Sequence, residues 1–481
     1  MHLRSIKEAE MYKKTNHQFR FSDFNQPMGL KLSPENRWVK KAETIPWDAI
    51  EDRYAKLFPS KTGMPAKPLR MALGALLIQK QLGCSDRELC EELKENPYMQ
   101  YFVGLPGFQQ NAPFVPSLLV EFRKRLTEKI LGEINEMIIE FNTEDDDRDD
   151  DGNNKGTLIL DATCAPQNIE FPQDINLLNQ ARQNLEAIVD SICETNGLRK
   201  PRMYRKVARK NHLRIAKCRK KTAKKLRGAI KQQLQYVRRD LRYIDGFIDA
   251  GYLPTERQQD RIDVIRTLYK QQRQMYDERT HSIADRIVSI SQPYVRPIVR
   301  GKAAAPTEFG AKLDMSIDER GLCRIEKLSF DAYNESEVLQ IATEHYKERT
   351  GHYPAKILVD KIYRNRGNLS YCKERGISIL GPALGRPKRL SKEALKAEYQ
   401  DNIDRIEVER GFSLAKRCYG LGRIYTKRED TSRSSIVLSI IAMNVEKLTA
   451  FLRNILMIIF SRFAQHRGAE VYIQNGSCVR C

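Results

Sequence analysis

Apolar residues recur at helical spacing through the first 143 residues. A periodic stretch from Leu69 to Leu82 ends at Gly83, and Ser85-x-x-Glu88 has the form of a capping box that starts the next helix. A further helix is predicted from about Ser117 to Phe141. Helix, tight turn and helix is the outline of a helix-turn-helix DNA reader, and a plain helical bundle used for packing or dimerisation has the same pattern. We therefore expect a helical domain over residues 1–143, with DNA binding and dimerisation both open.

The middle of the chain is also helical, but it is set apart by a linker. Residues 144–156 are acidic and rich in Gly and Asn, which is typical of a flexible connection. Over residues 175–295 long apolar stripes lie on either side of a chain break at Gly251-Tyr252-Leu253-Pro254. After the break, apolar residues stand at seven-residue spacing: Ile262, Tyr269, Tyr276, Ile283 and Ile290. Two long helices with facing stripes predict an antiparallel, coiled-coil-like arm.

Short aliphatic runs bounded by turn-forming residues predict the strands of an α/β domain over residues 157–465. The expected strands are a run ending at Asp161, a hairpin of Thr307 to Ile317 with Cys323 to Phe330, then Ala355 to Asp360 and Ile377 to Leu380. Helices are expected between the later strands, around Glu409, and from about Ser434 to Phe460. The long helical stretch would then be an insertion after the first strand.

Three carboxylates stand in suggestive positions in this domain. Asp161 and Asp360 each end an aliphatic run, and Glu409 opens a helical stretch. An acid at the end of a buried strand is costly unless a cation meets it. A single aspartate after an apolar run is more often a strand cap or a turn residue. Two strand-end aspartates with a helical glutamate can instead hold a pair of divalent ions for phosphoryl transfer.

Basic charge is concentrated in one segment. The chain has a formal net charge of +21, and the 44 residues from Arg199 to Arg242 contain nineteen Lys or Arg against one acid, Asp240. That density predicts contact with nucleic-acid phosphates, although a solvated face has the same composition. The residues expected to contact DNA there are Arg199, Lys200, Arg202, Arg205, Lys206, Arg209, Lys210, Lys220, Lys221, Lys224 and Lys225.

The spacing around the third acid resembles a known signature. Arg405-x3-Glu409-x6-Lys416 is similar to the Y-(2)-R-(3)-E-(6)-K pattern of bacterial insertion-sequence DDE transposases, with Asn402 where the Tyr belongs. Asp161-Ala162-Thr163 resembles the first catalytic motif of that family, and Asp360-x-x-Tyr363 resembles the second. The segment Pro68 to Gly104 is similar to the N-terminal domain of InsH-like members.

The resemblance implies an RNase H-like catalytic domain and an enzyme that cleaves transposon ends and joins them to target DNA. Asp161, Asp360 and Glu409 would be the catalytic residues and the ligands of two Mg²⁺ or Mn²⁺ ions. Expected partners are double-stranded DNA, as terminal inverted repeats and target, and a second copy of the chain. A catalytically silent DNA-binding descendant and a metal-dependent nuclease or resolvase are the alternatives.

Four further residues have expected roles near these acids. The family pattern assigns Lys416 to gripping DNA near the cleaved end, and Arg405 to a phosphate contact or to orienting the acid. Glu407 is the rival of Glu409, but two positions on a helix lie about 200° apart, so only one can face the site. Lys312 is expected to point at the active-site edge, where it would contact DNA, or to form a salt bridge with a neighbouring strand.

The remaining features point to a cytoplasmic, nucleoid-associated protein without a membrane partner. No apolar run reaches the roughly 18–20 residues of a membrane span, and the first residues have no apolar core of a secretory signal. The ten cysteines are scattered, which favours reduced thiols. Cys478-Val479-Arg480-Cys481 could be half of a metal site, but a disordered tail over residues 466–481 is the expectation.

Overall fold

The computed structural model describes residues 31–56, 65–143, 153–299, 307–382 and 392–466. Most of the expected acidic linker, and all but one residue of the expected tail, therefore lie outside the described residues.

Seven helices form the described part of the N-terminal region: α1 (Arg37–Glu43), α2 (Trp47–Ala55), α3 (Leu69–Leu82), α4 (Asp86–Glu95), α5 (Pro97–Phe102), α6 (Leu118–Arg125) and α7 (Glu128–Phe141). The predicted capping box is confirmed, with reciprocal hydrogen bonds between Ser85 and Glu88. The single helix expected from 117 to 141 is wrong. It is two helices, because Leu126 leaves the helical conformation at ψ 76° and Thr127 starts the next helix.

The sheet is mixed and six-stranded. Its strands are β1 (Thr157–Pro166), β2 (Arg296–Val299), β3 (Thr307–Ile317), β4 (Cys323–Ser329), β5 (Lys356–Val359) and β6 (Ser378–Leu380). The order is β2-β3-β1-β5-β6, with β4 also paired to β3. β1 runs antiparallel to β3 and parallel to β5.

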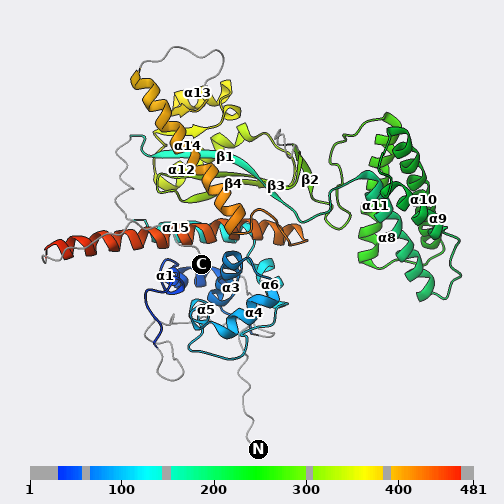
Figure 1. Ribbon diagram of the computed structural model, residues 1–481, viewed down its shortest axis with the longest axis horizontal. Helices are drawn as coiled ribbons and strands as arrows, with labels where there is room; N and C mark the ends of the chain where they lie inside the picture. The colour runs from blue at the N-terminus through cyan, green and yellow to red at the C-terminus, as the bar shows by residue number, and fades with distance from the viewer. Residues whose placement is uncertain (1–30, 57–64, 144–152, 300–306, 383–391, 467–481) are drawn as a thin grey trace, which may run out of the picture.

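Helices cover both faces of the sheet (Figure 1). Leu158, Leu160 and Val359 pack against α12 (Val338–Thr350) and α13 (Arg366–Glu374). The alternate residues, such as Ile159 and Leu358, belong to the core beneath α14 (Lys392–Cys418) and α15 (Glu429–His466). Side chains along a strand alternate between the two faces of the sheet, so neighbouring residues of one strand contact different helices.

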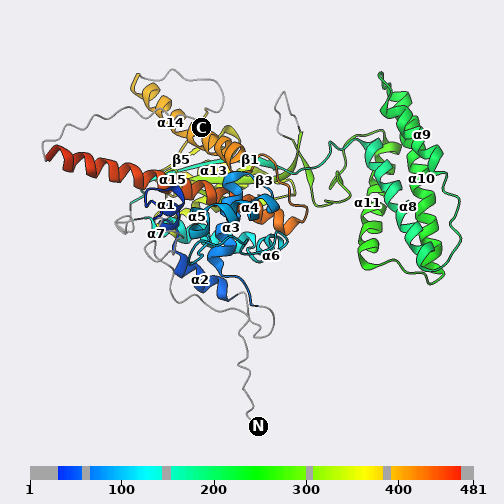
Figure 2. The same ribbon diagram turned by 60° about the horizontal axis from the view of Figure 1, so that its bottom comes forward.

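The helical stretch between β1 and β2 is a four-helix bundle, which we call the arm: α8 (Asp174–Thr195), α9 (Arg205–Ala216), α10 (Ala223–Asp249) and α11 (Glu256–Glu278). The expected pair of long helices on either side of the break is present as α10 and α11, but these two helices are only half of the bundle. α8 supplies Leu178 and Leu185 to a core shared with α10 and α11. The seven-residue pattern of apolar residues continues to Ile290, but the last helix ends earlier, at Arg279, which has a left-handed conformation. Figures 1 and 2 both show the arm standing apart from the sheet and the N-terminal helices.

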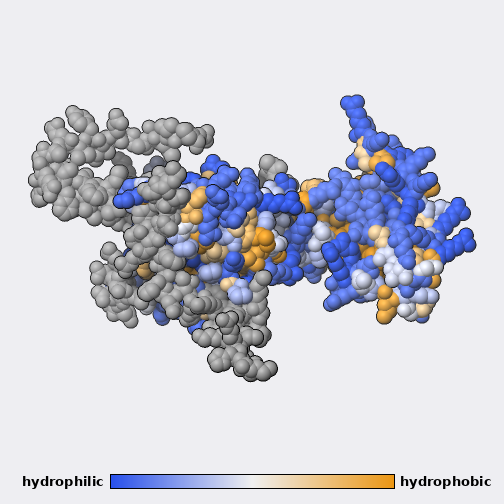
Figure 3. Space-filling model, turned by 90° about the horizontal axis from the view of Figure 1, so that it is seen from below, coloured by the Kyte–Doolittle hydropathy of each residue, from blue (hydrophilic) through white to orange (hydrophobic). Residues whose placement is uncertain are grey.

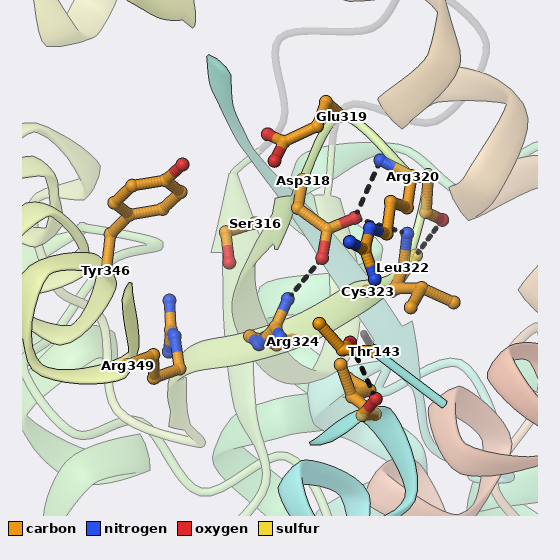
Figure 4. A network of polar contacts seen from close by, with 12 residues as sticks. Thr143, Ser316, Asp318, Glu319, Arg320, Leu322, Cys323, Arg324, Tyr346 and Arg349 are labelled. Atoms are coloured by element: carbon orange, nitrogen blue, oxygen red, sulfur yellow. Dashed lines mark hydrogen bonds and ion pairs between the residues drawn. The ribbon is translucent and has the colours of Figure 1, made fainter. Parts of the chain in front are cut away.

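The N-terminal helices and the sheet share one apolar core, and α15 runs between them. Polar side chains reinforce this contact. Asn444 of α15 donates to the carbonyl of Cys323 on β4 (2.7 Å) and to Asn135 of α7 (2.9 Å). Arg324 pairs with Glu136 of α7 (2.9 Å) and with Asp318 in the β3–β4 turn (2.7 Å); Figure 4 shows the turn and its partners. The described N-terminal helices and the sheet are thus packed together as one body.

One described segment, Glu429–Phe451 of α15, is long and apolar enough to cross a membrane by length and composition. The sequence expectation missed it, since Ser, Thr and Asn interrupt its apolar run. Within the protein 78% of its most apolar window is buried, as in the core helix of a globular fold.

Candidate active site

Asp161 and Asp360 lie side by side on neighbouring parallel strands. The last paired residues of β1 and β5 are Leu160 and Val359, and each is followed directly by one of the two acids. Asp161 lies two residues after Ile159, and Asp360 lies two residues after Leu358. Because residues two apart along a strand share a face, both acids belong to the face of the sheet beneath α14. The expectation that Asp161 ends its strand is wrong, because β1 continues to Pro166 in register with β3. Only the pairing of β1 with β5 ends at this point, with the pair of Leu160 and Val359.

Glu409 reaches this edge from α14, which buries Val408 and Phe412 against the sheet. Gly411 allows the close approach. A Cβ at Gly411 would lie 3.3 Å from both Met315 Cε and Ile317 Cδ1 on β3. Met315 is the β3 residue paired with Asp161. The glycine therefore brings the helix onto the strand beside the one that carries the first acid.

Arg405 links the second and third acids. Its Nη1 atom lies 3.8 Å from Asp360 Oδ1 and 4.0 Å from Glu409 Oε1. The rival Glu407 instead pairs with Arg410 at 2.6 Å. Of the two glutamates, it is Glu409 that the structure brings to Asp360.

Burial raises the pKa of Asp161 to about 6, and the negative charges of Asp360 and Glu335 add to the rise. The Ala162 amide, which donates to Asp161 at 2.8 Å, and the Arg405 guanidinium oppose that shift. The side chains of Asp360 and Glu409 are 51% and 59% exposed. Asp161 is largely desolvated, whereas Asp360 and Glu409 are accessible to solvent. A bound cation would reduce the repulsion among the three acids.

The fit to a metal ion rests on this donor set. Carboxylate oxygens on rigid elements suit Mg²⁺ or Mn²⁺, and Asp161, Asp360 and Glu409 are the residues that could hold it. In the part of the chain that the structure describes, no three Asp, Glu, His or Cys side chains are drawn together tightly enough to form a ready-made metal cage. The three acids therefore lie near one edge of the sheet, but their side chains are not gathered around a single metal position.

Lys312 is engaged by another acid, which the sequence reasoning missed. Its Nζ atom lies 2.8 Å from Glu335 and donates to the Tyr333 carbonyl at 3.0 Å. The sequence predicts a salt bridge to a neighbouring strand, but the partner Glu335 lies in the 3₁₀ turn η4 (Glu335–Glu337). Nothing in the spacing of the chain points to Glu335, because a three-residue turn leaves no periodic pattern. The charge of Lys312 is balanced within the protein, which weakens the expectation that it contacts DNA.

Most of the basic residues expected to contact DNA are exposed on the arm: Arg199, Arg202, Lys206, Arg209, Lys210, Lys220, Lys221, Lys224 and Lys225. Two are tied to α8. Lys200 pairs with Glu194 (2.6 Å), and Arg205 pairs with Asp190 (2.6 Å). The visible surface of the arm in Figure 3 is mainly hydrophilic, with scattered apolar side chains. Lys416 lies elsewhere, in the last turn of α14, two turns beyond Glu409.

The helix-turn-helix outline is present in α3 and α4, but its charge is unfavourable for reading DNA. The second helix, DRELCEELKE, contains five acids and two basic residues. An acidic helix is repelled by phosphates at a groove, so α4 is poorly suited to the recognition position. The packing alternative for this segment fits the structure better.

The chain matches two protein families over separate segments. Residues 28–125 match a family described as a transposase domain (DUF772), and residues 357–446 match a transposase DDE domain. The second match includes Asp360, Glu409 and the whole of α14.

A curated relative and the solved structures add little detail. An uncharacterized protein, ORF8 in the nfe locus of Rhizobium meliloti, is 27% identical over 162 residues, which are 34% of this chain and 77% of that protein. No solved structure matches the chain. The two family matches, one at each end of the described fold, indicate that the chain is an insertion-sequence DDE transposase.

Proposed function

We propose that this protein excises a DNA element by cleaving at its terminal inverted repeats and joins the freed ends to target DNA. The catalytic unit would be an RNase H-like fold with Asp161, Asp360 and Glu409 as the acids that hold two Mg²⁺ or Mn²⁺ ions. The observation that carries this proposal is the register of β1 and β5. It places Asp161 and Asp360 one residue beyond the same pair, beneath the helix that carries Glu409.

Bound divalent ions would activate a water or a DNA 3′-hydroxyl and stabilise the leaving oxygen. The protein's own part is to position groups. The close contact at Gly411 keeps Glu409 near the strand acids, and Arg405 balances Asp360 and Glu409. Lys416, on the same helix, would hold a phosphate near the cleaved end. No protein nucleophile is required, because water and the 3′-hydroxyl attack phosphorus directly.

The exposed basic residues of the arm would hold the flanking DNA through its phosphates, without reading its sequence. Two ends must be cut and joined together, so we propose that at least two copies act on each element. The α4 helix is not proposed as the reader of the repeat.

A reconstituted reaction tests the function. Purified protein is given Mg²⁺, a labelled duplex that carries the inverted repeat flanking its gene, and a supercoiled target plasmid. We expect cleavage at the repeat and covalent joining of the labelled end to the plasmid. Cleavage without joining would indicate a nuclease or resolvase, and binding without cleavage would indicate a silent DNA-binding descendant.

A further inference from the structure

A buried carboxylate on β3 is bound by two tyrosines, and one of them belongs to the turn that carries Asp360. The Tyr363 hydroxyl donates to Asp314 Oδ1 at 2.5 Å, and the Tyr333 hydroxyl donates to Asp314 Oδ2. Asp314 and Tyr363 are fully buried. Burial raises the pKa of Asp314 to about 6, against the effect of the two hydroxyls, so the carboxylate is mainly ionised at neutral pH.

The backbone connects Tyr363 directly to Asp360. Asp360 is the N-cap of the 3₁₀ turn η5 (Lys361–Tyr363), and its carboxylate accepts from the Lys361 amide at 2.8 Å. The Tyr363 amide donates to the Asp360 carbonyl at 3.1 Å. Asp360, Lys361 and Ile362 are all exposed, so Tyr363 is the one buried side chain of this segment. The position of the turn therefore depends on what holds Tyr363.

Asp314 is well placed to supply that hold. It lies in the centre of the sheet, paired with Ala162 on β1 and Lys327 on β4. Its sequence neighbour Met315 is paired with Asp161, so Asp314 faces the opposite side of the sheet from the acids. The hydrogen bond thus fixes the turn to the strand beside Asp161 without entering the site. Asn368 adds a second tie by donating to the Tyr363 carbonyl at 2.8 Å.

We infer that Tyr363 and Asp314 are positioning residues, which set where the Asp360 carboxylate stands relative to Asp161. This inference rests on the proposed function, in which Asp360 is a metal ligand. Neither residue touches the reacting atoms. In proteins that bind metals, partners behind the ligands commonly change metal affinity by about 10–100-fold when they are removed.

Two tyrosines on one carboxylate give a matched pair of variants. Tyr363→Phe removes the hydroxyl on the Asp360 turn, and Tyr333→Phe removes the hydroxyl that is remote from it. Mn²⁺ binding to the full-length protein without DNA is measured by electron paramagnetic resonance, with thermal unfolding measured in parallel. We expect Tyr363→Phe to weaken Mn²⁺ binding by about tenfold and Tyr333→Phe to change it less than twofold. Both variants should lose similar thermal stability, because each leaves the same carboxylate with one donor fewer.

Equal weakening in both variants would mean that Asp314 has a purely structural role, and unchanged binding in Tyr363→Phe would also overturn the inference. Asp360→Ala is the reference that separates the inference from the proposed function. If Asp360→Ala abolishes Mn²⁺ binding while Tyr363→Phe leaves it unchanged, only the positioning role fails. If Asp360→Ala binds Mn²⁺ like the wild type, Asp360 is not a ligand, and the proposed function fails together with the inference.

Discussion

Nη1 of Arg405 lies 3.8 Å from Oδ1 of Asp360, although the two residues belong to different elements, α14 and the end of β5. The same nitrogen lies 4.0 Å from Glu409, one helical turn further along. The guanidinium therefore sits between two half-exposed acids and reduces their mutual repulsion. Its position shows that α14 is docked with the face of Glu409, and not that of Glu407, toward the strand acids.

The basic surface of the arm should dominate binding to DNA of any sequence. Replacing six exposed residues (Lys206, Arg209, Lys210, Lys220, Lys221 and Lys224) with Gln should weaken binding and flatten its salt dependence. Each lost phosphate contact removes about 0.9 from the slope of log K against log salt. Fluorescence anisotropy from low to moderate salt measures this slope. Arg266→Gln with Arg273→Gln is the control, because these two arginines of α11 are already paired, Arg266 with Asp245 of α10 and Arg273 with Asp277 of α11. An unchanged slope in the six-residue variant would mean that the arm is a solvated spacer.

Gly411 should be intolerant of large side chains. Gly411→Leu must push α14 away from Met315 and Ile317, so we expect a loss of roughly 1–3 kcal/mol in the free energy of unfolding and a large loss of cleavage. Gly411→Ala should be tolerated, since the methyl would meet only the flexible ends of two side chains at 3.3 Å. Urea denaturation and end cleavage measure the two effects.

Gly246 in α10 is the control for this series, because a Cβ there meets nothing within 4 Å. Gly246→Leu should be neutral or slightly stabilising, and cleavage should be kept. Full cleavage by Gly411→Leu would contradict the claim that the closeness of the helix positions Glu409.

The sequence predicted the strands next to Asp161 and Asp360 better than it predicted the helices of the arm. Asp161 and Asp360 follow aliphatic runs that really are adjacent strands, because buried parallel strands need continuous apolar residues. The arm was misjudged because α9 buries few apolar residues, among them Ala208 and Ile215, so its helical period is faint. The bond from Tyr363 to Asp314 joins residues 49 apart and depends on strand register, which no local pattern contains.

The N-terminal helices should not fold alone. Their core continues into α15 and the sheet, and buried Lys41 of α1 pairs with Glu446 of α15 at 2.5 Å. A fragment of residues 1–143 would expose that apolar face and lose the contacts of Asn135 and Glu136. We expect it to aggregate or to melt without a cooperative transition, as followed by circular dichroism, while the full chain melts cooperatively. A sharp transition with dispersed amide resonances would show that this segment is an autonomous domain.

Lys80 should make stability depend on pH. It lines a cavity of about 690 Å³ between α3 and the α14–α15 connection, where its Nζ donates to Ser435 Oγ at 2.7 Å. Burial, with a smaller contribution from Arg123, lowers the pKa of Lys80 to about 7. Between pH 7 and the usual lysine value of 10.5 the folded protein holds fewer protons than the unfolded chain, so stability rises with pH across this window. Lys80 is half-buried, and below pH 7 the cost of desolvating its charge is fully present.

Lys80→Met removes that cost. We expect this variant to be more stable than the wild type near pH 7, with a difference that shrinks as the pH approaches 10. Urea denaturation at several pH values measures the difference. Lys94→Met, measured over the same pH values, is the control, since it makes the same substitution at an exposed pair with Glu91. A constant advantage of Lys80→Met at every pH would mean that the lost charge is not its cause.

The central claim is that Asp161, Asp360 and Glu409 form one catalytic site. Its most direct test is end cleavage by Glu409→Gln and Glu407→Gln, with Asp161→Ala and Asp360→Ala as references and DNA binding measured for each. Glu407 pairs with Arg410 at 2.6 Å on the same helix, so it controls for losing a carboxylate from α14. We predict that Glu409→Gln, Asp161→Ala and Asp360→Ala abolish cleavage while binding DNA at least as tightly as the wild type, and that Glu407→Gln still cleaves. An active Glu409→Gln beside an inactive Glu407→Gln would contradict the account.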